Sequence, residues 1–121
     1  MKVYRAENAS RGTILADRVF SAESFAARCR GLLGTRELGT GEGVWLRPCH
    51  AIHTCFMRYA IDALFLDKEN RLLHAGTYAP WRMSRYVPQS RGVLELAAGA
   101  LARSGTRPGD QIRLSIREDL N

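Results

Sequence analysis

Residues 61–77 read Ile-Asp-Ala-Leu-Phe-Leu-Asp-Lys-Glu-Asn-Arg-Leu-Leu-His-Ala-Gly-Thr, and they indicate the class of fold most clearly. The first six are apolar apart from Asp62, which is typical of a strand that is buried on both faces. Residues 67–70 form a polar turn, and Arg71–Thr77 has the composition of a second strand. The segment therefore predicts a β-hairpin inside a layered β structure.

Six further segments have the composition or the alternation of strands. They are Lys2–Ala6, Thr13–Phe20, Gly43–Arg47, Ala51–Arg58, Val93–Leu96 and Ile112–Ile116. Residues 78–91 have no clean period and predict a long loop, a kind of segment that is often functional.

Two segments predict helices. The longer one begins at the N-cap residue Ser21, carries Cys29 on its apolar face and ends at Gly34. The shorter one spans about Ala98–Ser104 and ends at Gly105. We therefore expect one mainly β domain (α+β at the margin) over residues 1–121, a small β-barrel or sandwich with one longer and one shorter helix.

Several short motifs resemble a known family. They are Ile52-His53-Thr54, Met57-Arg58, Ile61-Asp62, Phe65-Leu66-Asp67, Arg30-Gly31-Leu32-Leu33, Val93-Leu94-Glu95-Leu96 with Gly99, and Gly109-Asp110. Together they resemble the bacterial and archaeal family called domain of unknown function 192, from about Ala26 to Leu114. Many members have a Phe-Trp-Met-Lys-Asn-Thr core, whose asparagine this chain lacks, so no role is carried over from it. The resemblance implies a compact, mostly β domain with no established activity.

Charge and composition narrow the classes of partner. The net charge of +6 comes mainly from arginines that are dispersed along the chain, whereas a nucleic-acid site needs a clustered basic stripe with aromatic platforms. The N-terminus has no apolar run of the signal-peptide type, and no apolar stretch approaches the roughly 20 residues of a membrane span. We expect a cytoplasmic protein without specific nucleic-acid binding or membrane insertion, whose three cysteines are reduced.

The candidate site consists of polar residues in apolar sequence and residues of the motifs above. These are His53, Arg58, Asp62, Trp81, Arg82 and Glu95. In the functional interpretation, the arginines hold an anionic or carbonyl-bearing ligand, Trp81 covers it, and the two acids orient the guanidinium groups. In the structural interpretation, Arg58 and Asp62 form an internal ion pair that fixes the sheet, because either charge buried alone would be costly.

Two other chemistries use the same stretch. Cys49, His53, Cys55 and Met57 would share one face of an extended strand, but alternate residues lie roughly 6.5 Å apart there, so we expect no metal and no cofactor. Cys55 and His53 are close enough in sequence to form a nucleophile and its base. The sequence therefore predicts a non-catalytic small-ligand or protein-interaction module, with a Cys/His-dependent enzyme acting on a small substrate as the alternative. His74 is expected to be structural or exposed.

Overall fold

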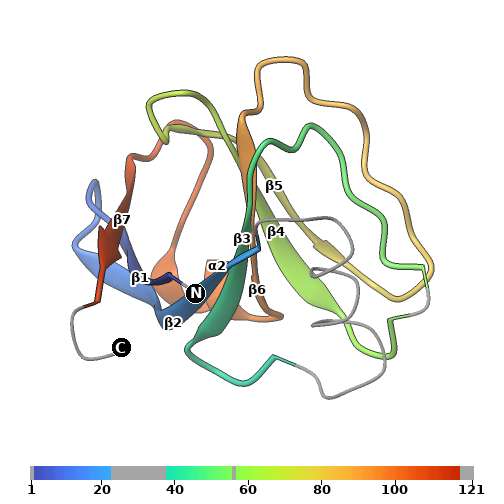
Figure 1. Cartoon of the computed structure of the whole chain (residues 1–121), viewed down its shortest axis with the longest axis horizontal. Coiled ribbons are helices and arrows are strands. Elements are labelled where there is room, and N and C mark those ends of the chain that lie inside the picture. Colours follow the sequence, from blue (N-terminus) through green and yellow to red (C-terminus); the bar gives the residue numbers. More distant parts are fainter. Residues whose placement is uncertain (1, 23–37, 56, 118–121) are drawn as a thin grey trace.

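The computed structural model describes residues 2–22, 38–55 and 57–117, and in this part seven strands form one sheet in the order β5-β4-β6-β3-β2-β1-β7 (Figure 1). The strands are β1 (Val3–Asn8), β2 (Thr13–Ala22), β3 (Glu42–Leu46), β4 (Ile61–Leu66), β5 (Leu72–Tyr78), β6 (Gly92–Ala97) and β7 (Ile112–Ile116). A short helix, α2 (Ala100–Ser104), precedes β7. The pair β2–β3 is parallel, and the other neighbours are antiparallel.

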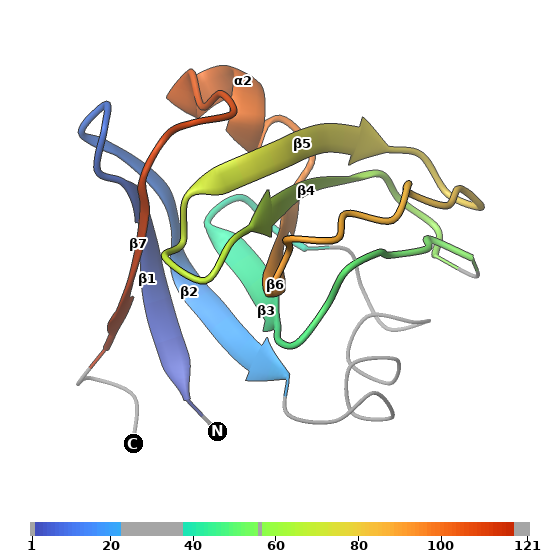
Figure 2. The same ribbon diagram turned by 90° about the horizontal axis from the view of Figure 1, so that it is seen from above.

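The sheet curls into a half-barrel whose two edge strands meet at one corner (Figure 2). Arg71 and Gln111 form an isolated antiparallel bridge there. On either side of it, the Leu72 amide donates to the Asp110 carbonyl over 2.9 Å, and the Ile112 amide donates to the Asn70 carbonyl over 3.0 Å. Beyond this corner β5 and β7 run apart (Figures 1 and 2).

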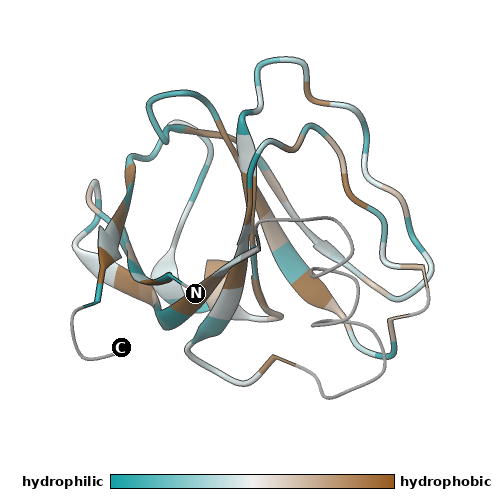
Figure 3. Cartoon of the chain, viewed as in Figure 1, coloured by the Kyte–Doolittle hydropathy of each residue, from teal (hydrophilic) through white to brown (hydrophobic). Residues whose placement is uncertain are grey.

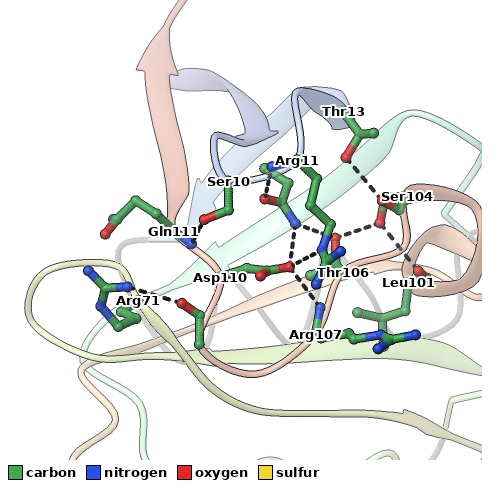
Figure 4. A network of polar contacts seen from close by, with 12 residues as sticks. Ser10, Arg11, Thr13, Arg71, Leu101, Ser104, Thr106, Arg107, Asp110 and Gln111 are labelled. Atoms are coloured by element: carbon green, nitrogen blue, oxygen red, sulfur yellow. Dashed lines mark hydrogen bonds and ion pairs between the residues drawn. The ribbon is translucent and has the colours of Figure 1, made fainter.

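The buried carboxylate of Asp110 stabilises this corner through hydrogen bonds. Asp110 Oδ2 accepts hydrogen bonds from Arg11 Nε at 2.7 Å, Asn8 Nδ2 at 2.9 Å and the Arg107 amide at 2.9 Å (Figure 4). The hydrogen bonds from Arg11 and then Asn8 lower the Asp110 pKa from 3.8 to about 2, because they stabilise the charged form. The β1–β2 turn is thereby tied to the turn that leads into β7.

Two apolar clusters occupy the two faces of the sheet. The interior cluster contains Ala6, Leu15, Ala16, Val19, Trp45, Leu64, Leu66, Leu72, Leu94, Leu96, Ala100 and Ile112. The outer cluster contains Val44, Leu46, Cys49, Ile52, Met57, Ile61, Ala63, Phe65, Val87 and Val93. Residues from β3, β4 and β6 enter both clusters, so these central strands are buried on both faces, as the apolar run of β4 predicts.

The mainly β fold class is confirmed, and so is the hairpin, in which Phe65 of β4 lies opposite His74 of β5. The predicted shorter helix is present as α2. The predicted longer helix, with Cys29, lies outside the described residues apart from its first positions, and Ser21 belongs to β2 instead of capping a helix.

The predicted strand over Ala51–Arg58 is wrong. Among the described residues of this stretch, His53 alone forms a bridge, with Met83. The chain turns directly afterwards, because the Met57 amide donates back to the Thr54 carbonyl over 3.1 Å. Cys49, His53, Cys55 and Met57 therefore do not line one face: Cys49 and Met57 are buried, whereas His53 is exposed.

Candidate functional site

Residues 50–54 and 81–87 lie antiparallel to each other and are here called the ribbon (Figure 1). Three backbone hydrogen bonds of 2.8–2.9 Å join its two arms. They run from the Val87 amide to the His50 carbonyl, from the Ser84 amide to the Ile52 carbonyl, and from the Thr54 amide to the Arg82 carbonyl. The ribbon is thus an ordered element, although its irregular spacing prevents it from forming regular strands.

Thr54 joins the two arms of the ribbon through several hydrogen bonds. Its side chain is fully buried, and its Oγ1 donates to the Ala79 carbonyl over 2.6 Å and accepts from the Arg82 amide over 2.8 Å. Its carbonyl accepts from the Trp81 amide over 3.0 Å. These bonds hold Trp81 at φ 62°, a left-handed conformation that a bulky side chain rarely adopts. The candidate set above omits Thr54, and the Ile52-His53-Thr54 motif is the sequence signal that could have found it.

The ribbon has an apolar inner side and a mixed outer side. Ile52 and Val87 are buried in the outer cluster. Trp81, Met83 and Tyr86 are 57%, 78% and 63% exposed. The Tyr86 ring stacks on the His50 ring with a centroid distance of 5.3 Å. Figure 3 shows hydrophobic and hydrophilic residues mixed along both arms. The outer side therefore presents large apolar side chains from a fixed backbone.

The segments that carry the ribbon are strongly basic. Residues 47–60 and 79–91 contain no aspartate and no glutamate. They contain five arginines, all of them exposed: Arg47, Arg58, Arg82, Arg85 and Arg91.

His74 of β5 lies within the electrostatic influence of one of these arginines. Burial is the larger cause that lowers the pKa of His74, and the positive charge of Arg85 lowers it further. His74 is half-buried, its Nε2 lies 3.3 Å from Tyr78 Oη, and its ring lies 5.5 Å from that of Phe65.

The six predicted site residues occupy three places. His53, Trp81 and Arg82 lie together on the ribbon, and Arg58 is exposed between the ribbon and β4. Asp62 and Glu95 are buried in the sheet, with exposures of 0% and 3%. Asp62 lies opposite Leu96 of the interior cluster, whereas Glu95 lies opposite Ala63 of the outer cluster, so the sheet separates the two acids. They cannot both orient arginines around one ligand.

Asp62 has a different set of partners from the expected one. Its Oδ1 accepts from Thr77 Oγ1 at 2.6 Å, and its Oδ2 accepts from the amides of Gly99 and Leu101 at 3.0 and 2.9 Å. The carboxylate thus joins β4 to β5 and to the start of α2, in the manner of a helix-capping group. The expected Arg58–Asp62 ion pair is wrong, because backbone and hydroxyl donors satisfy Asp62 while the Arg58 side chain is exposed.

Two side chains of this region, those of Cys49 and His53, form hydrogen bonds with backbone groups. His53 Nδ1 accepts from the Cys55 backbone amide at 3.3 Å, and Cys49 Sγ donates to the Ala51 carbonyl at 3.2 Å. Within residues 2–22, 38–55 and 57–117, no three side chains of His, Cys, Asp or Glu gather in a metal-binding group. No helix among these residues is long and apolar enough to cross a membrane.

The described part of the chain thus defines a small, mainly β half-barrel that presents a basic and apolar ribbon. Residues 6–114 match the family model of DUF192, described as "Uncharacterized ACR, COG1430", and the chain belongs to this family. The resemblance found in the sequence motifs is thereby confirmed.

The chain is similar to a curated protein in sequence and to two solved structures in fold. A UPF0127 protein of Thermococcus sibiricus (strain DSM 12597 / MM 739) is 29% identical over 119 residues, which cover 93% of this chain and 75% of the relative. A solved protein of unknown function from Novosphingobium aromaticivorans DSM 12444 matches with a TM-score of 0.71 at 22% identity, over 93% of this chain and 84% of the other. A "putative transcription regulator" from Sinorhizobium meliloti 1021 matches with a TM-score of 0.67 at 24% identity, over 93% and 92%.

Proposed function

We propose that this protein is a non-catalytic interaction module whose ribbon binds a segment of a partner protein that is rich in acidic and apolar residues. One observation carries the proposal: Trp81, Met83 and Tyr86 are exposed side by side in sequence with Arg82 and Arg85. Tryptophan, tyrosine, methionine and arginine are enriched in protein interfaces. A small number of such side chains often supplies most of the binding free energy.

The order of the ribbon supports an interface. Thr54 and the cross-arm hydrogen bonds fix the backbone of residues 81–87 before a partner arrives, and His50 stacks on Tyr86. Binding to a surface that is already ordered costs less conformational entropy than binding to a mobile loop. The exposed apolar groups thus have a geometry that a partner can match.

The charge of the ribbon defines the chemistry of the partner. Five exposed arginines and the absence of acids in the flanking segments favour carboxylates, and guanidinium groups bind carboxylates in a bidentate manner. A basic partner would be repelled. A small anion held by Arg82 beside Trp81 would use the same cations, but it would leave Met83 and Tyr86 uncovered.

A peptide selection tests the proposal. A random displayed peptide library is selected on the wild-type protein, and the enriched peptides are measured by isothermal titration calorimetry. We expect sequences that combine Asp or Glu with aromatic or aliphatic residues, and at least about tenfold weaker binding to Trp81→Asn, which keeps a residue type that tolerates the left-handed backbone. The control is Arg113→Gln, which changes an exposed residue of β7 outside the ribbon. Equal affinity for Trp81→Asn and wild type, or enrichment of basic peptides, would contradict the proposal.

A further inference from the structure

A groove of about 700 Å³ lies away from the ribbon, among β1, β2, β7 and α2. Its volume falls within the range of small-molecule sites. The ribbon packs on a different part of the sheet: its residues Ile52 and Val87 belong to the outer cluster, together with residues of β3, β4 and β6. The groove is therefore a second candidate site, independent of the proposed function.

The groove carries exposed apolar surface. The described part of the chain exposes five large hydrophobic side chains, of which three belong to the ribbon. The other two, Ile14 and Ile116, both line the groove and are 54% and 62% exposed. Leu15, Ala16 and Ala100 also contribute to its lining. Outside the ribbon, exposed large apolar groups in the described chain are thus concentrated where the surface is hollow.

The charged groups of the groove favour an anion. Its lining contains Arg5, Arg103 and Arg117 against Glu7 and Asp17, so one net positive charge remains. Arg117 is engaged, because its Nη1 donates to the Asp17 carbonyl over 2.6 Å and lies 3.9 Å from Asp17 Oδ2.

Arg5 and Arg103 have a different environment from Arg117. Both are exposed, and within the described residues neither lies within ion-pair distance of a carboxylate. Both line the groove, and the Arg103 guanidinium lies over Gly99. Glu7 is the acid of the lining that opposes them, because it lies two residues from Arg5 on the same strand.

We infer that this groove binds a small organic anion with an apolar tail, a carboxylate or phosphate monoester whose charged head contacts Arg5 and Arg103 while the tail covers Ile14, which shares one face of the sheet with Arg5 and Glu7. Apolar contact supplies most of the affinity at such a site, and the guanidinium groups set the orientation. The inference requires both parts of the ligand, so a tail without a negative head and a head without a tail should each bind poorly.

Octanoate, well below its micelle concentration, is the probe, and octylammonium and acetate are its matched comparisons. Binding is followed by amide chemical-shift changes in two-dimensional NMR spectra of the whole chain. We expect octanoate to shift amides of residues 14–17, 100–103 and 115–117 and to bind at least about fivefold more tightly than either comparison. Equal shifts with octylammonium, or octanoate shifts confined to the ribbon, would overturn the inference.

Charge variants make the test specific. Arg5→Gln and Arg103→Gln should each weaken octanoate binding by about threefold to fivefold, whereas Glu7→Gln should strengthen it, because it removes the opposing charge. Arg113→Gln is the control, since Arg113 is an exposed arginine of β7 that does not line the groove. The same loss of affinity in Arg113→Gln as in Arg5→Gln and Arg103→Gln would show that only the net charge of the protein matters, and it would refute the site.

Discussion

Replacing Asp110 by asparagine should destabilise the protein by an amount that depends on pH. The variant keeps the shape of the side chain but removes the negative charge that accepts from Arg11, Asn8 and the Arg107 amide. The lowering of the Asp110 pKa from 3.8 to about 2 corresponds to slightly more than 2 kcal/mol at 1.36 kcal/mol per pKa unit. Solvent screens part of it, because the Arg11 side chain is 41% exposed, so we expect about 1–2 kcal/mol.

The sign of the pH dependence follows from the direction of this shift. A carboxyl group with a lowered pKa in the folded state binds protons less readily than in the unfolded chain, so its stabilising effect is complete above about pH 4–5. That effect is lost as the pH falls from 3.8 towards about 2. Wild type and Asp110→Asn should therefore differ at pH 7, and the difference should shrink as the pH falls from about 4 and vanish only below about pH 2.

Urea unfolding at several pH values measures this difference, with tryptophan fluorescence as the reporter, because Trp45 is buried in the interior cluster and becomes exposed on unfolding, whereas Trp81 is already 57% exposed. Asp17→Asn is the matched control, since the Asp17 side chain is 62% exposed and lies 3.9 Å from Arg117. We expect this control to change the unfolding free energy by less than about 1 kcal/mol. A pH-independent difference for Asp110→Asn, or one no larger than that of the control, would refute the assignment of the charge to the corner network.

Three further substitutions test other parts of the fold. Asp62→Ala should lower the free energy of unfolding by about 3 kcal/mol, as measured by urea titration, and by clearly more than Thr77→Val, because it removes a buried acceptor and leaves three partly buried donors without it; equal losses would contradict the capping role. Thr54→Val should speed amide hydrogen exchange at Trp81 and Arg82 while Thr54→Ser preserves protection, and unchanged exchange in the valine variant would show that the hydroxyl does not hold the ribbon. Gly92→Ala should lower the melting temperature, with about 1–3 kcal/mol of destabilisation, because the new methyl group would overlap the Trp45 ring; an unchanged melting temperature would mean that the ring can move aside.

The sequence predicts the elements whose signals are local. The β4–β5 hairpin has an apolar run, a polar turn and a second strand in sequence, and the irregular segment 78–91 lacks any period. The order of the strands in the sheet depends on residues far apart in the sequence. β3 pairs in parallel with β2, and it pairs with β6, which begins about forty-five residues after β3 ends. No short sequence pattern specifies these partners.

The candidate site was only partly predictable for a related reason. Asp62 suggested an arginine partner because Arg58 is near in sequence, but its donors include backbone amides 37 and 39 residues away. Backbone amides leave no signature in a sequence, and any residue can supply them. Thr54 does not stand out in the sequence, because threonine in an apolar segment is ordinary and the hydrogen bonds of its side chain are to backbone amides and carbonyls more than twenty residues away. Trp81 and Arg82 stand out in the sequence, because they place an aromatic and a cation in an irregular segment.

The most direct test of the interaction surface is NMR mapping of a selected acidic-apolar peptide on the isotope-labelled protein. We predict shift changes concentrated in residues 50–54 and 81–87, with the largest at Trp81, Met83 and Tyr86, and weakening of the complex as salt rises because arginine–carboxylate attraction is screened. Shift changes that spare these two segments and gather elsewhere on the half-barrel would contradict the assignment of the ribbon as the binding surface.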